Sequence, residues 1–248
     1  MPLARAALLP LLVLIPSVAI AQAQAPFAAP PGAVGPGASV LRPPPARDGV
    51  DTLTMVMVQN GVSIAVGMLV SESRSVAGPG GVPAVRRVET TTSRMVPSTV
   101  DTFVVALRTL APVSQRTHED RVVALDFAGR TVRGTITEGE RTGAVELALP
   151  TPVFYDNSMD LVLGSLPLSD RYTAELPVYD DETGTVAWRH VQVAGSDSLP
   201  GNGEMADAWR VDTTRGAIHS TYWIDKRTHL MLRWALPLPN GAELRIVR

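Results

Sequence analysis

Apolar and polar residues alternate with a period of two through most of the chain after residue 51, and this pattern constrains the fold most. The clearest stretch follows Asn60-Gly61, where apolar residues occupy every second position from Val62 to Val70. A period of two places successive side chains on opposite faces of a strand, and Asn-Gly is a strong signal for a two-residue hairpin turn. The pattern therefore predicts antiparallel strands with one buried face and one face in water.

We expect strands over residues 52–59, 62–70, 85–95, 100–110, 121–127, 131–137, 143–149, 172–179, 185–194, 208–213, 217–224, 230–236 and 242–247. Only residues 157–166 read as a good helix, with Asn157 or Ser158 as the N-cap, a broad apolar face and Pro167 as the stop. So many closely spaced strands favour a mainly β fold. We predict a curved antiparallel sheet or incomplete β-barrel, with one short helix packed against its concave face.

The N-terminus has the build of a secretory signal peptide. Arg5 precedes an uncharged, leucine-rich run over residues 6–20, and small residues at cleavage spacing predict processing near Ala21 or Ala23. The run is shorter than the roughly 20 residues of a membrane-spanning helix and contains two prolines, so cleavage is favoured over anchoring. We therefore expect residues 1–23 to be removed. The mature chain is expected to be periplasmic or secreted and to have no transmembrane span.

The rest of the chain divides into two parts. Residues 24–48 are rich in proline, alanine and glycine, a composition that predicts a disordered linker. Residues 49–248 are expected to form a single β-rich domain, since 45% hydrophobic content is enough for a sizeable core. The net charge of −2 gives no reason to expect a nucleic acid partner, and the absence of cysteine excludes disulfides.

No catalytic or metal-binding motif is recognisable, so we predict no catalytic residues, no metal and no cofactor. His118-Glu119-Asp120 offers three possible ligands, but adjacent strand residues point to opposite faces. The acidic turn at residues 180–182 is better explained as a solvated hairpin tip than as a pair of catalytic carboxylates. The glycines at 78, 80 and 81 lack the lysine and helix of a phosphate-binding loop.

The aromatic residues suggest a binding site instead. All four tryptophans lie in the C-terminal strands. Core packing explains such residues in many strands, and the alternative is that some of them line an apolar cavity on the concave side of the sheet. The candidates for ligand binding are Phe154, Leu163, Trp188, Trp223 and Trp234.

The C-terminal third also resembles a bacterial envelope family, the domain-of-unknown-function family 3108. The resemblance rests on Phe154-Tyr155-Asp156, on Leu176-Pro177-Val178-Tyr179 and on Thr221-Tyr222-Trp223-Ile224-Asp225, and it is specific after Val153. That family is similar in architecture to the Lol-type lipoprotein carriers and related lipid-binding proteins. The resemblance implies an antiparallel sheet that wraps as an unclosed barrel around an apolar cavity, and it implies no activity.

These observations favour a non-enzymatic exported envelope protein that binds an apolar or amphipathic ligand in a half-barrel cavity. The expected ligand is a lipid or a lipoprotein acyl group. One alternative is a structural or protein-interaction module of the cell envelope, in which exposed sheet edges pair with a partner protein. A third possibility, an uncharacterised hydrolase, lacks any supporting motif.

Overall fold

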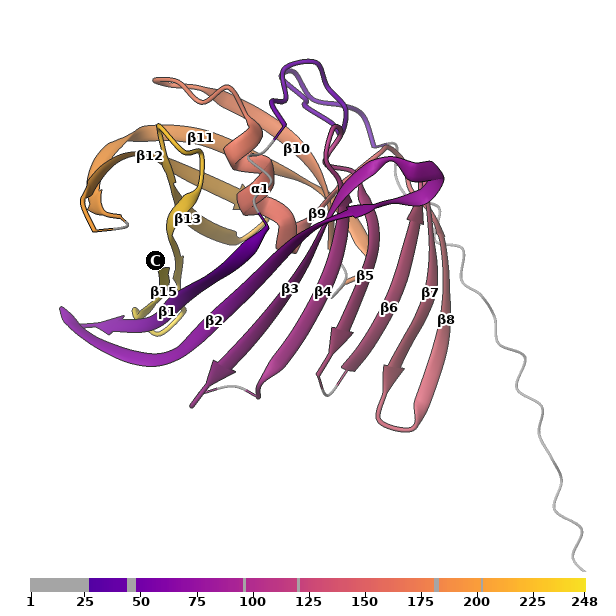
Figure 1. The fold of residues 1–248 in the computed structure, drawn as a ribbon, viewed down its shortest axis with the longest axis horizontal. Coiled ribbons are helices and arrows are strands. Elements are labelled where there is room, and N and C mark those ends of the chain that lie inside the picture. Colours follow the sequence, from indigo (N-terminus) through magenta and orange to yellow (C-terminus); the bar gives the residue numbers. More distant parts are fainter. Residues whose placement is uncertain (1–26, 44–47, 96, 120, 181–182, 202) are drawn as a thin grey trace, which may run out of the picture.

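A single sheet, antiparallel except where β9 pairs with β10, bends around one short helix in the computed structural model, which describes residues 27–43, 48–95, 97–119, 121–180, 183–201 and 203–248 (Figure 1). The predicted signal peptide at residues 1–23 lies outside these residues. The strands are β1 (Gly49–Gln59), β2 (Val62–Ala77), β3 (Pro83–Ser93), β4 (Thr99–Ala106), β5 (Pro112–His118), β6 (Arg121–Ala128), β7 (Thr131–Glu138), β8 (Arg141–Ala148), β9 (Phe154–Tyr155), β10 (Thr173–Asp180), β11 (Thr185–Pro200), β12 (Met205–Arg215), β13 (Ile218–Asp225), β14 (Met231–Pro237) and β15 (Glu243–Val247). The helical segments are η1 (Pro79–Gly81), η2 (Asp156–Ser158) and α1 (Met159–Ser165).

Most strands pair with their neighbours in sequence, as expected for a meander of hairpins. The β1–β2 hairpin turns at Asn60 and Gly61, whose φ angles of 51° and 78° are the left-handed values that Asn-Gly turns adopt. The strand order is β8-β7-β6-β5-β4-β3-β2-β1-β15-β14-β13-β12-β11-β10-β9. The pairing of β1 with β15 therefore joins the two halves of the meander into one sheet.

The sheet does not close into a barrel, because β8 and β9 form its two ends and do not pair with each other. Its β9–β10 end packs instead against β3–β7. Phe103 of β4 contacts Tyr155 of β9 edge to face, and Phe127 of β6 contacts Tyr179 of β10 in the same way, with ring centroids 5.8 and 5.4 Å apart. Both tyrosines belong to a buried cluster with residues of β3, β4, β6 and β7. These contacts roll the sheet into an incomplete barrel.

Helix α1 lies inside this roll (Figure 1). Its buried residues Met159, Val162 and Leu163 pack in one cluster with apolar residues of β10–β13. Gly164 allows the helix to approach the β13–β14 loop closely, because an added Cβ would lie 2.3 Å from the carbonyl oxygen of His229. The predicted fold class is thus confirmed. No helix among the described residues is long and apolar enough to cross a membrane.

The expected disordered linker is wrong for residues 27–43, which we call the N-terminal strap. These residues cross the top of the molecule beside α1 and β10 (Figure 1). The amide of Val34 donates to the carbonyl of Glu175 at 2.9 Å, and the amide of Arg42 donates to that of Ser165, the last residue of α1, at 2.8 Å. The strap therefore holds β10 and the end of the helix together.

Side chains of the N-terminal strap add apolar contacts. Phe27 stacks on Trp188 of β11 with ring centroids 4.7 Å apart, and Val34 and Leu41 pack against the cluster that contains α1. Prolines restrict the backbone of the free segment, so docking it loses less conformational entropy than docking an ordinary chain would. A few apolar side chains are then enough to fix the segment on the domain.

Several strands differ from the expectation: β9 was not predicted, β2 continues to Ala77 beyond the predicted end at residue 70, and β4 ends at Ala106 before the predicted end at residue 110. Strand β5 (Pro112–His118) was not predicted, and it lies between β4 and β6 inside the sheet. Strand β11 continues to Pro200, beyond the predicted end at residue 194, after a register shift between Val193 and Gly195. The shift lets the long strand bend and keep its pairing with β12.

Candidate functional site

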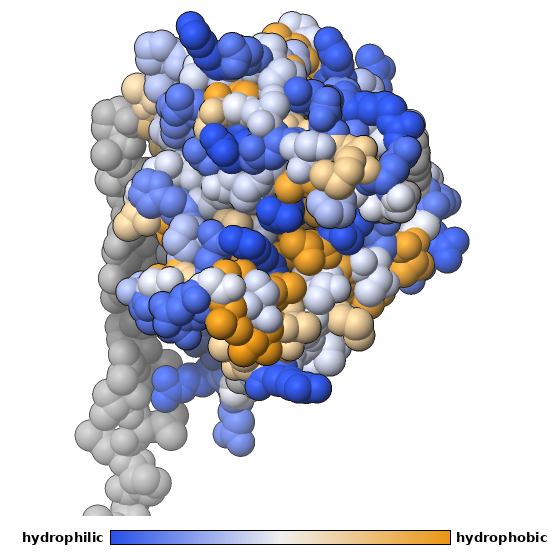
Figure 2. Space-filling view, turned by 90° about the vertical axis from the view of Figure 1, so that its left-hand side faces the viewer, coloured by the Kyte–Doolittle hydropathy of each residue, from blue (hydrophilic) through white to orange (hydrophobic). Residues whose placement is uncertain are grey.

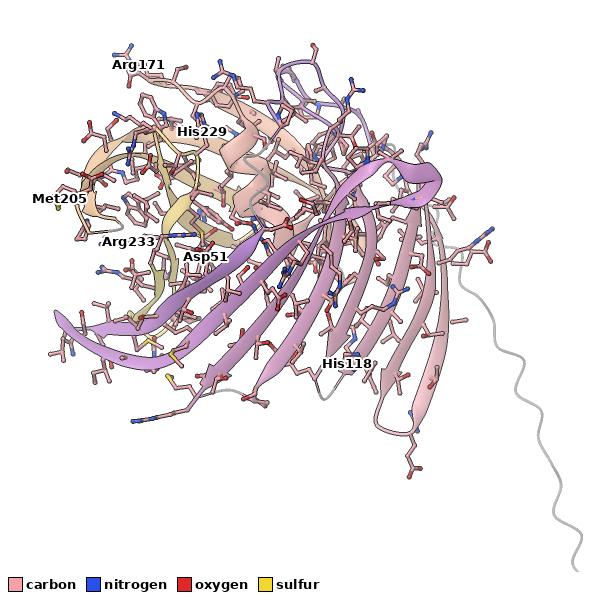
Figure 3. All side chains as sticks on the ribbon, in the orientation of Figure 1. Asp51, His118, Arg171, Met205, His229 and Arg233 are labelled. Atoms are coloured by element: carbon pink, nitrogen blue, oxygen red, sulfur yellow. The ribbon has the colours of Figure 1, made fainter. Side chains whose placement is uncertain are left out.

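A cavity of about 310 Å³ lies within the roll, between α1 and the strands that join the two halves of the sheet. Its lining comes from β1–β3, from η2 and α1, and from β11–β15 with the β13–β14 loop. Asp51 near the start of β1 and His229 in the loop both contribute to it, and both are labelled in Figure 3. Segments from both ends of the chain thus meet around one space.

Many of the residues that line the cavity are apolar. Leu53 of β1 and Leu69 of β2 are cross-strand partners, and Trp234 of β14 is the partner of Ile246 of β15. The apolar lining residues are Leu53, Leu69, Met159, Leu161, Ile218, Leu230, Met231, Trp234, Leu236 and Ile246. Such a surface gains free energy when it covers an apolar group, at roughly 25 cal/mol for each Å² removed from water.

Charged side chains also line the cavity. Three of them form what we call the arginine wall: Arg87 of β3, Arg189 of β11 and Arg215 of β12. The side chains of these arginines are only 11%, 6% and 11% exposed, respectively. Buried guanidinium groups require charged or polar partners, because transfer of an unpaired charge from water is very unfavourable. The wall is therefore built as a network of ion pairs.

Aspartates of η2, α1 and β10 supply the partners. Arg87 donates from Nη1 to Oδ2 of Asp160 at 2.7 Å. Arg189 donates from Nη2 to Oδ1 of Asp156 at 2.5 Å. These bonds tie the start of the helical segment to both halves of the sheet.

Arg215 completes the network. Its Nη1 atom lies 3.1 Å from Oδ2 of Asp156 and 2.9 Å from Oδ2 of Asp180. Asp180 was expected to belong to a solvated acidic turn, and its side chain is instead only 14% exposed and ion-paired. The other two residues of that turn, at positions 181 and 182, lie outside the described part of the chain.

Glu89 of β3 also lines the cavity and has an unusual acidity. Burial, assisted by the negative charges of Asp160 and Asp101, raises the pKa of its carboxyl from 4.5 to about 7. Arg87, whose Nη1 atom lies 3.5 Å from Oε1 of Glu89, acts in the opposite direction without cancelling the effect of burial. This carboxyl is consequently about half protonated at neutral pH.

Neutral polar groups complete the lining. Burial raises the pKa of Tyr222 to about 12, so its hydroxyl stays protonated across the physiological range. The hydroxyl of the lining residue Ser220 lies 2.9 Å from that of Thr213, within hydrogen-bonding distance. The lining of the cavity thus combines apolar side chains with charged and hydroxyl groups.

An apolar row leads from the cavity toward the β1–β2 hairpin. The lining residue Leu236 is paired with Leu244, Leu244 with Met57, and Met57 with Ile64. Directly paired residues of antiparallel strands lie on the same face, so all four side chains continue the cavity surface. We call them the apolar row. Ile64 is 60% exposed, and the hairpin belongs to the lower half of the face in Figure 2, where apolar side chains gather.

Of the five residues predicted to bind a ligand, only Trp234 lines this cavity. Phe154 and Leu163 are fully buried in the core cluster around α1. Trp188 stacks on Phe27 of the N-terminal strap. Trp223 donates from Nε1 to Oδ2 of Asp197 at 2.7 Å. The aromatic distribution thus identified one lining residue and missed the arginine wall.

No cluster of three or more histidine, cysteine, aspartate or glutamate side chains that could hold a metal ion occurs among the described residues. His118 ends β5 on the lower side of the sheet, far from His229 (Figure 3). Glu119 follows it in an exposed turn, and residue 120 lies outside the described part. Nδ1 of His190 lies 2.7 Å from Oε1 of Glu175, and neither residue lines the cavity.

Comparison with known proteins identifies the family. No curated protein matches the sequence. Among solved structures, the chain is similar to a β-barrel-like protein of the domain of unknown function DUF1849 from Brucella abortus, with a TM-score of 0.48 and 10% identity over 80% of this chain and 94% of that chain. The family model of DUF3108, a protein family of unknown function, matches residues 76–247. This match confirms the resemblance noted in the sequence, and because it spans more than half of the sequence, the chain belongs to the DUF3108 family.

Proposed function

We propose that this protein binds an amphipathic ligand, a lipid or an acyl-bearing molecule, in the cavity beside α1. The observation that carries the proposal is a lining that combines many apolar side chains with the arginine wall. An acyl chain against the apolar side chains would gain about 0.8 kcal/mol for each buried CH₂ group, and a polar end would meet the charged and hydroxyl groups. No chemical step is required for such a role.

The proposed setting is the periplasm or the cell exterior. It rests on the signal-peptide pattern of residues 1–23, which favours cleavage near Ala21 or Ala23. Sequencing the N-terminus of the protein recovered from the periplasm should give a chain that starts just after one of these alanines. Recovery of the intact N-terminus from the cytoplasm would contradict export.

Tryptophan fluorescence offers a direct test of binding, because Trp234 lines the cavity and Trp223 does not. Bromine quenches indole fluorescence at short range, so 2-bromododecanoic acid and 2-bromododecanol, which carry the bromine beside the polar end, should both be tried as ligands. We expect saturable quenching that disappears in Trp234→Phe and persists in the matched control Trp223→Phe. Native mass spectrometry of the same mixtures should show one ligand per chain.

The outcome that contradicts the proposal is equally definite. If neither ligand quenches the fluorescence and neither forms an adduct, the cavity does not hold an acyl chain. Equal loss of quenching in the Trp234 and Trp223 variants would place the bound chain elsewhere on the protein.

The alternative of a protein-interaction module rests on the end strand β8, whose outer edge has no partner strand among the described residues. That edge is short, and its exposed side chains include the charged residues Arg141 and Glu146. Charged side chains on a short edge oppose strand addition. The cavity therefore supports ligand binding more strongly than the edge supports a partner strand.

A further inference from the structure

Four buried N–H donors of lining residues make no hydrogen bond in the described part of the chain. Nη1 of Arg215 still has carboxylates within ion-pair distance, whereas Nε of Arg87, Nε of Arg189 and Nε1 of Trp234 are the three donors considered below. Arg189 is the most deeply buried of the three, with a side chain only 6% exposed. A buried donor without a partner has lost its hydration and gained nothing in exchange. These atoms therefore favour any acceptor that a ligand brings.

Among the buried lining atoms that the structure describes, no acceptor lacks a hydrogen bond. The lining carboxylates Asp156 and Asp160 accept charge-assisted hydrogen bonds from Arg189 and Arg87. Asp51 accepts two from Arg248, at 2.6 and 3.1 Å. Every buried lining atom that lacks a hydrogen bond is thus a nitrogen donor. The polar side of the cavity is complementary to an acceptor and does not favour an ammonium group.

Two lining carboxyls lie near Arg87. Asp160 accepts a short hydrogen bond from it, whereas Oε1 of Glu89 lies 3.5 Å from its Nη1 atom. Burial raises the pKa of the Glu89 carboxyl to about 7. Below neutral pH it is mainly protonated and therefore adds little negative charge to oppose an anion near Arg87. The electrostatic character of the wall then depends on the guanidinium groups and their paired aspartates.

From these observations we infer that the ligand enters with an oxyanion, a carboxylate or a phosphate ester, as its polar end. This inference rests on the proposed binding function and specifies the chemistry of the ligand at the same site. The oxyanion lies at the arginine wall near Arg87 and Arg189, and the acyl chain follows the apolar row through Leu236 and Met57 toward Ile64. Oxyanions form stronger hydrogen bonds to guanidinium groups than neutral acceptors do.

Isothermal titration calorimetry with four ligands of equal chain length tests the polar end. The ligands are dodecanoate, dodecyl phosphate, dodecanol and dodecylammonium. We expect both anions to bind at least about tenfold more tightly than the alcohol, since hydrogen bonds to charged groups contribute more than neutral ones. The ammonium should bind most weakly, and the order of the two anions identifies which oxyanion the wall accepts.

Two variants test the placement of the two ends. Trp234→Phe replaces the indole with a smaller ring that has no donor, so it should weaken binding of the anions by a larger factor than binding of dodecanol. Ile64→Ser changes an exposed residue of the apolar row and should weaken the anions and the alcohol by the same factor. Circular dichroism of both variants controls for folding.

The possible failures are distinguishable. Equal affinity for all four ligands, or tightest binding of the ammonium, overturns the inference and leaves the proposed binding function standing. Absence of binding by any of the four ligands overturns the inference together with the proposed function. An Ile64→Ser variant that binds every ligand normally refutes the path of the acyl chain.

Discussion

Replacement of Glu89 by glutamine examines the electrostatics of the cavity without changing the size of the side chain. Glu89 lies on β3, beside Arg87 on the same strand and opposite Asp101 on β4. Asp160 of α1, which is paired with Arg87, supplies another negative charge near Glu89. Because burial raises the pKa of Glu89 to about 7, ionisation of this carboxyl opposes folding.

The sign of the pH effect follows from the two pKa values. The unfolded chain releases the proton of Glu89 near pH 4.5, and the folded chain releases it near pH 7. Stability is therefore unaffected at low pH, falls as the pH rises from 4.5 to 7, and levels off above 7. The difference between the two values corresponds to about 3 kcal/mol at 1.36 kcal/mol for each pKa unit. Glu89→Gln should therefore be more stable than the natural protein by up to about 3 kcal/mol at about pH 8, and by less than about 1 kcal/mol at about pH 5.

Urea unfolding at a series of pH values measures this difference directly. Glu146→Gln is the matched control, because Glu146 pairs with Arg133 on the exposed face of β7 and β8 and its side chain is 71% exposed. That variant should keep the pH dependence of the natural protein. If Glu89→Gln gains no stability between about pH 5 and about pH 8, Glu89 is ionised in the folded chain and the attraction of Arg87 outweighs burial.

Two further predictions concern the packing around α1. Alanine is normally favoured over glycine inside a helix by about 1 kcal/mol, but Gly164→Ala should lower the melting temperature, because its Cβ would lie 2.3 Å from the carbonyl oxygen of His229. The matched control is Gly143→Ala in β8, where the nearest atom would be 3.9 Å from the added Cβ, and it should leave the melting temperature unchanged or raise it. A higher melting temperature for Gly164→Ala would disprove the close approach of the helix to the loop. Phe27→Ala removes the ring that stacks on Trp188 and should cost about 1 kcal/mol. Limited proteolysis with mass spectrometry should then show faster cleavage within residues 27–43, and an unchanged rate would show that Phe27 does not hold the N-terminal strap.

The hairpins were predictable because their signals are local. Asn60-Gly61 encodes a turn, and the alternation beyond it encodes which face is buried. Strand β5 lacks such a signal, since its inward position is occupied by Gln115, which is 1% exposed. Its place in the sheet is set by pairing with β4 and β6. A polar strand between two partners is stabilised by backbone bonds that its own residue pattern does not reveal.

The N-terminal strap illustrates a different limit. Its composition correctly indicates that it cannot build a core of its own. The groups that hold it, among them the carbonyls of Thr109, Ser165 and Glu175, come from three distant segments. Whether a proline-rich segment docks or stays free depends on surfaces that exist only after the rest of the chain has folded.

The arginine wall could have been found from the sequence by asking which strand positions break the apolar register. On β11, Val193 and Val191 point into the core, and Arg189, two residues earlier on the same face, lines the cavity. On β3, Val85 belongs to the core cluster, and Arg87 follows two residues later at the cavity. A buried charge in an apolar register marks the point along a strand where dense packing ends. Two strands, from opposite halves of the sheet, change from valine to arginine in this way, and both changes border the same space. The aromatic residues gave a weaker signal, because a tryptophan suits a core, a surface stack or a cavity equally well, whereas a buried arginine requires a partner of opposite charge and therefore a particular site.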